Sequence, residues 1–180
     1  MKIGVFLGSA RREGNTEELV NRVIKNIDAD VFHLLDYRIE PIVDMRHTEQ
    51  GFSPVDDDAE DLVKKMLEYD VLIFATPLYW YTMSGHMKNF IDRWSQFLRS
   101  ESLGFLPNMK QKKAYLIVTS GDKRKITPLP LVQQFQYICQ FIGVEFVDYL
   151  LGTGNKPGEI VDDSSALAKA EEWNAIFRNM

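Results

Sequence analysis

The chain has 180 residues, of which 45% are hydrophobic and 26% are charged, and its formal net charge is -5. This length and composition predict one globular domain over residues 1–180, and the negative charge without a long basic run argues against a general nucleic-acid binder. Because Cys139 is the single cysteine, the chain has no intramolecular disulfide and no cysteine-ligated metal or iron–sulfur cluster.

The first predicted elements are a strand, a small polar loop and a helix. The apolar run Lys2-Ile-Gly-Val-Phe-Leu7 predicts a buried strand, and a helical pattern covers residues 15–27. Between them lies Gly8-Ser-Ala-Arg-Arg-Glu-Gly-Asn-Thr16. Such a loop gathers backbone N–H groups and a helix N-terminus at one spot, which suits a phosphate. The alternative is an ordinary turn and a helix capped by Asn15 with Glu18 three residues later.

The glycines of this loop fit neither of two common phosphate-binding motifs. No Lys-Ser/Thr pair follows them, so the segment is not a P-loop. The spacing of Gly8 and Gly14 also differs from the G-x-G-x-x-G fingerprint of dinucleotide-binding domains. The loop therefore predicts a phosphate site of another kind.

Apolar runs and amphipathic helical patterns alternate through the rest of the chain. This alternation predicts an α/β fold with a doubly wound, five-stranded parallel sheet. Ser84 and Asp163 are candidate helix N-caps, and Pro130 suits a first helical turn. Strands are expected near 2–7, 30–35, 70–75, 113–119 and 144–151, and helices near 15–27, 57–68, 84–98, 130–142 and 164–178. Residues 36–56 and 99–112 are long irregular connections, which are usually functional or interfacial.

Three loops leave the carboxyl edge of this predicted sheet, where open parallel sheets bind ligands. They are Gly8 to Thr16, Thr76-Pro-Leu-Tyr-Trp-Tyr-Thr82, and Thr119-Ser-Gly-Asp-Lys-Arg-Lys125. Three consecutive aromatic residues in the second loop suit stacking on a flat ligand, although they also suit a hydrophobic rim or a subunit contact. The third loop is short and polar, as a solvated turn or a set of hydrogen-bonding groups would be.

Two motifs in these loops resemble those of the flavodoxin-like NAD(P)H-dependent FMN reductases, which include quinone reductases and iron–sulfur flavoproteins. The motifs are Gly8-Ser-x-Arg-x-x-Gly-Asn-Thr16 and Pro77-x-Tyr-x-x-x-x-Ser84-x-x-x-Lys88-x-x-x-Asp92-Arg93. The resemblance covers nearly the whole chain. It implies the strand order 2-1-3-4-5, an FMN cofactor, and homodimers or dimers of dimers with flavin sites near the subunit interface.

The resemblance also assigns roles to individual residues. The FMN phosphate would be held by Ser9, Arg11, Asn15 and Thr16, with a backbone N–H from Glu17. The isoalloxazine would lie along Pro77, Leu78, Tyr79 and Trp80, and its pyrimidine end would meet Ser120, Gly121 and Asp122. Lys88, Asp92 and Arg93 match the second motif, but their spacing also allows surface ion pairs, so we expect a structural or interfacial role for them.

One departure from the iron–sulfur branch concerns the loop after the second strand. That branch carries a cysteine cluster there, whereas this chain reads Pro41-Ile-Val-Asp-Met-Arg-His-Thr48. Electron transfer would therefore use flavin alone. His33, His47 and His86 lack metal-ligand spacing, so no metal site is expected.

The expected function is an FMN-dependent NAD(P)H oxidoreductase. It would transfer hydride through FMN to a quinone, nitro or azo compound, flavin or metal chelate, with no obligatory catalytic side chain. The alternatives are a non-enzymatic flavodoxin-type electron carrier and a flavin-binding regulatory protein. The N-terminus lacks a signal-peptide pattern and no apolar run is long enough to span a bilayer, so we expect a cytoplasmic protein without membrane contact.

Two surface features complete the expectations. Arg12 and the run Lys123-Arg124-Lys125 add positive charge beside the expected flavin, which favours NADPH over NADH. The expected dimer would use the aromatic loop together with Phe52, Leu103, Phe105 and Leu106, unless these side chains fold back onto their own chain.

Overall fold

The structure, a computed structural model, describes residues 1–98, 100 and 102–180, so Arg99 and Glu101 of the predicted 99–112 connection lie outside it. The strands form one parallel sheet in the order β2-β1-β3-β4-β5, which confirms the flavodoxin-like α/β fold. In chain order the elements are β1 (Ile3–Leu7), α1 (Asn15–Val23), β2 (Ala29–His33), η1 (Leu34–Asp36), α2 (Ala59–Met66), β3 (Val71–Pro77), α3 (Gly85–Phe97), α4 (Phe105–Met109), β4 (Lys113–Ser120), α5 (Leu129–Ile142), β5 (Glu145–Thr153), η2 (Glu159–Asp162) and α6 (Ser164–Arg178).

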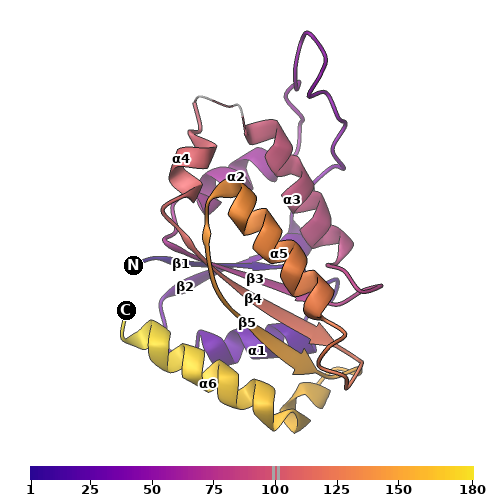
Figure 1. Cartoon of the computed structure of the whole chain (residues 1–180), viewed down its shortest axis with the longest axis vertical. Helices are drawn as coiled ribbons and strands as arrows, with labels where there is room; N and C mark the ends of the chain where they lie inside the picture. The colour runs from indigo at the N-terminus through magenta and orange to yellow at the C-terminus, as the bar shows by residue number, and fades with distance from the viewer. Residues whose placement is uncertain (99, 101) are drawn as a thin grey trace.

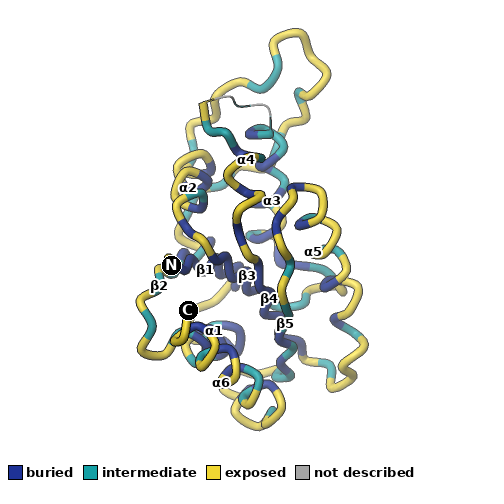
Figure 2. The backbone as a smooth tube through the Cα atoms, turned by 60° about the vertical axis from the view of Figure 1, so that its left-hand side comes forward, coloured by how far each residue is buried: buried dark blue, intermediate teal, exposed yellow. Residues whose placement is uncertain are grey.

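Two helical layers cover the sheet, with α1 and α6 on one face and α2, α3, α4 and α5 on the other (Figure 1). Successive side chains of a strand point to opposite faces, so Phe6 and Phe74 pack toward α3, whereas Val5 and Ile73 pack toward α1. Both faces of the central strands are covered, which explains why β3 and β4 are almost wholly apolar (Figure 2).

The helix ends follow local chemistry. The predicted caps are confirmed: the hydroxyl of Ser84 accepts the Met87 N–H, and the carboxylate of Asp163 accepts the Ala166 N–H. Pro130 lies in the first turn of α5, as predicted. The first helix ends at Val23, earlier than residue 27, because the chain turns there and Asn26 takes a left-handed conformation with φ of 57°.

The second irregular connection contains a helix that the sequence analysis did not predict. Helix α4 has only five residues, too few for a helical period to stand out. Phe105 is 1% exposed, and Leu103 and Leu106 pack against the core around α3. These three side chains therefore fold back onto their own chain, and the prediction that they form subunit contacts is wrong for Phe105.

The first irregular connection leaves the body between η1 and α2 and is exposed along most of its length (Figures 1 and 2). Its base is fixed by Arg93, which is 1% exposed and forms an ion pair with the buried carboxylate of Asp57. Arg93 also donates to the Glu40 carbonyl at 3.1 Å. On helix α3, the predicted surface ion pair forms between Lys88 and Asp92, at 2.6 Å. Arg93 of the same helix is instead a core residue.

No helix among the described residues is long and apolar enough to cross a membrane.

Candidate functional site

The candidate site is a cavity of about 230 Å³ at the carboxyl edge of the sheet, where the loops after β1, β3 and β4 meet. A fourth segment, which follows β5, completes its wall. The cavity lies where the three predicted loops were expected to converge. Its lining residues are Ser9, Arg11, Gly14, Asn15, Thr16, Pro77, Leu78, Tyr79, Thr119, Ser120, Gly121, Gly154, Asn155 and Pro157.

The N-terminus of α1 faces this cavity without a side-chain cap. Gly14 is the N-cap residue, and a glycine has no side chain to accept the first N–H groups of the helix. Ser9 instead folds onto the loop, where its hydroxyl donates to the Arg11 carbonyl at 2.9 Å. The uncapped N–H groups at the start of α1 and the exposed guanidinium of Arg11 together form a site for an anion.

The alternative interpretation, in which Asn15 caps this helix, is wrong. Asn15 is the first residue inside α1, and its side chain reaches the segment after β5. There its amide nitrogen donates to the Lys156 carbonyl at 2.9 Å, and its amide oxygen accepts the Ile160 N–H at 3.3 Å. The side chain of Asn15 thus has partners within the protein.

Thr16 and Glu17 also use their side chains locally. The Thr16 hydroxyl is buried and shares a hydrogen bond of 2.5 Å with the Thr119 hydroxyl at the end of β4. The Glu17 carboxylate accepts the Glu13 N–H at 2.6 Å and does not line the cavity. Thr16 therefore lines the cavity with its hydroxyl already bonded to Thr119, and Glu17 can meet a ligand there through its backbone N–H.

The loop after β3 forms a small hairpin. Tyr79 and Thr82 exchange both backbone hydrogen bonds at 3.0 Å, with Trp80 and Tyr81 at the turn. Both turn residues have positive φ, 49° and 64°, which is rare for large aromatic residues. Trp80 is 93% exposed at the tip and does not line the cavity, whereas Tyr79 lines its rim. The hairpin is tied to α5 by a hydrogen bond of 2.9 Å between Thr82 and Gln134.

The loop after β4 contributes Ser120 and Gly121, but not Asp122, to the cavity. Asp122 accepts hydrogen bonds from Arg124 and Thr127, and those from Arg124 hold the pKa of its carboxyl well below the usual range. The Leu78 N–H donates to the Thr119 carbonyl at 2.7 Å, which fixes the β3 loop against the β4 loop.

Most of the predicted positive charge beside the site is paired with carboxylates. Arg12 pairs with Asp36 and Arg124 with Asp122, and Lys125 pairs with Asp163 at 2.5 Å. Among the described residues, no carboxylate lies within ion-pair distance of Arg11 or Lys123. The local excess of positive charge is therefore smaller than the sequence suggested.

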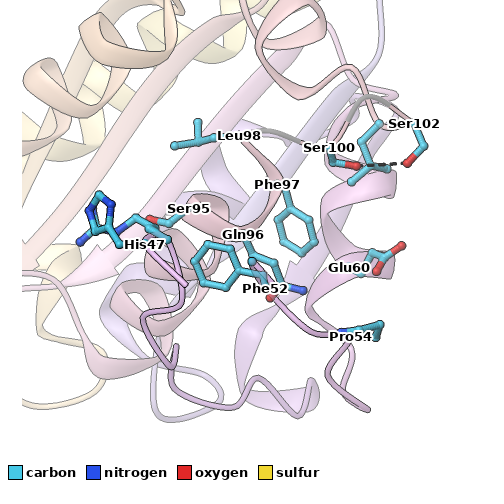
Figure 3. A pocket seen from close by; sticks show the side chains of 13 residues that line it. His47, Phe52, Pro54, Glu60, Ser95, Gln96, Phe97, Leu98, Ser100 and Ser102 are labelled. Atoms are coloured by element: carbon cyan, nitrogen blue, oxygen red, sulfur yellow. Dashed lines mark hydrogen bonds between the residues drawn. The ribbon is translucent and has the colours of Figure 1, made fainter. Parts of the chain in front are cut away.

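A larger cavity, of about 610 Å³, lies elsewhere, between the exposed connection before α2 and the end of α3 (Figure 3). Phe52, Phe97 and Leu98 line it together with His47 and Gln96. Its lining among the described residues includes Glu60 in the first turn of α2, but no strand end and no residue of the Gly8–Thr16 motif. The smaller cavity is the candidate functional site because the ends of three strands and the uncapped N-terminus of α1 meet there.

Five lining residues of the site were not assigned from the sequence: Gly14, Thr119, Gly154, Asn155 and Pro157. Gly14 and Thr119 belong to two of the predicted loops, whereas the other three follow the edge strand β5, outside those loops. A signal was present in the three glycines and the proline of residues 152–158, which indicate a tight loop at the carboxyl edge.

Comparison with known proteins agrees with this geometry. The sequence profile of the NADPH-dependent FMN reductase family matches residues 1–141. YwqN of Bacillus subtilis (strain 168), named as an NAD(P)H-dependent FMN-containing oxidoreductase, is 47% identical over 171 residues, which cover 94% of each chain. The iron–sulfur flavoprotein MJ1083 of Methanocaldococcus jannaschii is 29% identical over 181 residues, covering 94% of this chain and 92% of that protein.

Among solved structures, the Trp repressor binding protein from Bacillus subtilis is similar over 96% of this chain and 99% of its own. Its TM-score is 0.81 and its sequence identity is 42%. With the profile match over most of the chain, these similarities settle the family. The chain belongs to the NADPH-dependent FMN reductase family.

Proposed function

We propose that the cavity binds FMN and that the protein transfers hydride from NAD(P)H, through FMN, to a small-molecule acceptor. The observation that carries the proposal is the glycine-capped N-terminus of α1, which opens onto a cavity formed by the loops after β1, β3 and β4. Family membership supports FMN as the ligand. The acceptor is a quinone, a nitro or azo compound, a free flavin or a metal chelate.

The residues of the β1 loop fit a phosphate. A side chain at Gly14 would crowd the Arg11 side chain, because an added Cβ lies 3.2 Å from Arg11 Cγ. Gly14 therefore leaves room at the start of α1 for the phosphate oxygens, which the backbone N–H groups of Asn15, Thr16 and Glu17 would bind. Ser9 and Arg11 supply the side-chain donors.

The remaining walls fit a flat ring. Pro77, Leu78 and Tyr79 would lie along one side of the isoalloxazine, and Ser120 and Gly121 would meet its polar edge. When bound, FMN supplies the hydride chemistry, while the protein binds it, orients it and limits its exposure to solvent. No side-chain acid or base is required, so we assign no catalytic residue.

We expect the FMN-loaded protein to be reduced by NAD(P)H, with a preference for NADPH. Lys123, whose ammonium group has no ion-pair partner among the described residues, would attract the additional phosphate of NADPH. Lys123→Ala should lower the second-order rate of reduction about fivefold at low salt, since unit charges close together in water interact by about 1 kcal/mol. Stopped-flow bleaching of the flavin by NADPH and by NADH measures this.

The matched control is Lys113→Ala, which removes the same charge from the first residue of β4, at the opposite edge of the sheet. It should leave the rate and its dependence on salt unchanged. Equal rates and salt slopes for the two variants would remove Lys123 from nucleotide capture. Failure of both nucleotides to reduce the wild-type flavin would reject the enzyme and favour the electron carrier or the regulatory protein.

The proposed assembly is a homodimer or a dimer of dimers. It is supported by the hairpin tip, where Trp80 is 93% and Tyr81 59% exposed although both hold strained backbone conformations. Light scattering of the FMN-bound protein at micromolar concentration should give at least twice the monomer mass, and Trp80→Ser should shift the mass toward that of the monomer. A monomeric wild type contradicts the proposal.

A further inference from the structure

The segment between β5 and η2 forms one wall of the candidate site, although it lies about 140 residues from the β1 loop. Gly154, Asn155 and Pro157 line the cavity. The segment continues from the edge strand, so the sheet holds it on one side only. The Gly154 N–H donates to the Ser120 carbonyl at 2.9 Å on that side. Its position over the cavity therefore depends on further contacts.

Asn15, at the start of α1, provides those contacts. Its amide nitrogen donates to the Lys156 carbonyl at 2.9 Å, and its amide oxygen accepts the Ile160 N–H at 3.3 Å. One side chain thus satisfies a donor and an acceptor of the segment at once. Because Asn15 is only 8% exposed, water does not readily replace it in these bonds.

Two glycines allow the segment to approach so closely. A Cβ added to Gly154 would lie 2.7 Å from the amide nitrogen of Asn15 and 3.0 Å from the Ile160 nitrogen. A Cβ added to Gly121 would lie 3.0 Å from the amide oxygen of Asn155. Each asparagine amide therefore packs on the bare backbone of a glycine in the facing loop.

The backbone of Asn155 is held by hydrogen bonds, whereas its side-chain amide is free to bind a ligand. The Glu159 carboxylate accepts the N–H groups of Asn155 at 2.8 Å and of Lys156 at 3.0 Å, which holds the turn. The amide of Asn155 has no hydrogen-bond partner within the described part of the chain, and it lines the cavity beside Gly121. An amide offers one acceptor and two donors to a ligand there.

We propose that Asn15 is a positioning residue that holds residues 154–158 as the fourth wall of the flavin site, and that the Asn155 amide binds the flavin. This proposal rests on the proposed function. The Asn155 amide packs against Gly121 of the β4 loop, which the proposed function places at the polar edge of the isoalloxazine. We therefore expect its contact to fall on the part of FMN that riboflavin shares.

The first test needs no flavin. In the apoprotein, Asn15→Ala should speed hydrogen exchange at the Ile160 N–H, which loses its acceptor, while exchange at Leu19 and Val20 within α1 stays unchanged. Unchanged exchange at Ile160 would overturn the positioning role of Asn15.

The second test compares two ligands by fluorescence titration of the apoprotein. Asn15→Ala should lower the affinities for FMN and for riboflavin by the same factor, roughly tenfold, because residues 154–158 lose the contacts that hold them over the cavity. Asn155→Ala should weaken both by roughly three- to tenfold. Arg11→Ala should lower the affinity for FMN and leave that for riboflavin unchanged. A loss confined to FMN in Asn15→Ala would identify Asn15 as a phosphate ligand and overturn the proposal.

Asn174→Ala is the matched control. Asn174 on α6 also fixes distant backbone, since its amide donates to the carbonyls of Val23 and Lys25 at 2.9 Å. It lies outside the cavity, so this variant should lower stability without changing either affinity. Equal losses of flavin affinity in Asn174→Ala and Asn15→Ala would show that the loss in Asn15→Ala comes from general destabilisation of the protein, and would contradict the proposal.

Gly154→Ala tests the coupling from the other side. The added methyl group meets the Asn15 amide, so this variant should also lower the affinities for FMN and for riboflavin. Combined with Asn15→Ala its further effect should shrink, because the amide it meets is gone. Simple additivity would contradict the contact. If wild type binds no flavin, the proposed function and the role of Asn155 both fail, whereas exchange at Ile160 still decides the role of Asn15.

Discussion

Arg93→Met should lower the free energy of unfolding by about 3–5 kcal/mol, because it leaves the Asp57 carboxylate buried without its cation. Arg93 and Asp57 are both almost fully buried, and Arg93 also bonds the Glu40 carbonyl and the side chain of Gln96. Urea denaturation followed by circular dichroism measures the change.

Lys88→Met is the control for this prediction. Lys88 lies on the same helix and forms an ion pair with Asp92, but solvent reaches both side chains, which are 53% and 37% exposed. Its loss should cost about 0.5 kcal/mol or less. Adding Asp57→Asn to Arg93→Met should recover part of the stability, since the unpaired buried charge is removed. A loss in Arg93→Met as small as that in Lys88→Met would contradict the buried pair.

The same pair predicts sensitivity to acid. Burial alone would raise the pKa of Asp57, but hydrogen bonds from Arg93 and from the N–H groups of Glu40 and Ala59 outweigh it and hold the pKa below its usual value. A lowered folded-state pKa stabilises the protein above the unfolded pKa, and this stabilisation is lost as the pH falls through the folded pKa. The part of the acid sensitivity that lies below about pH 4 should therefore diminish in Arg93→Met/Asp57→Asn.

The sheet was predictable because its signal is local. The short continuous apolar runs of β3 and β4 are typical of strands covered on both faces, and the helical stripes between the strands identify the layers that cover them. Asp163 and Ser84 cap helices through bonds that span three residues, so their roles also follow from the nearby sequence.

The errors concern side chains whose partners are distant in the sequence. The pattern of Asn15 and Glu18 matches a capping box, yet Asn15 bonds residues 156 and 160, which no local pattern can include. The carboxylates beside Arg12 and Lys125 are also distant in the sequence, so their partial neutralisation of this charge could not be predicted. Positive φ at Trp80 was also unpredictable, because hairpin turns of this kind favour asparagine and glycine.

Gly14→Asp should abolish most FMN binding while leaving the protein folded and slightly more stable. Gly14 has φ of -90° and ψ of 171°, a conformation that any residue adopts, so the substitution introduces no backbone strain. The added Cβ meets only the Arg11 and Ser9 side chains, and the exposed Arg11 side chain can shift to make room. An aspartate at this N-cap position would accept the first N–H groups of α1, which gains a few tenths of a kcal/mol. The same carboxylate would occupy the place proposed for the phosphate.

The loss of FMN affinity should be about 4 kcal/mol, the repulsion between two unit charges about 4 Å apart near a protein surface. Gly14→Ser is the matched variant: its hydroxyl caps the same helix without a charge, so the loss should be about 1 kcal/mol. Riboflavin has no phosphate, and its affinity should change little in either variant. Fluorescence titration of apoprotein with FMN and riboflavin, beside thermal unfolding, measures all of these quantities. Equal losses for FMN and riboflavin in Gly14→Asp would show that the phosphate does not lie at the start of α1.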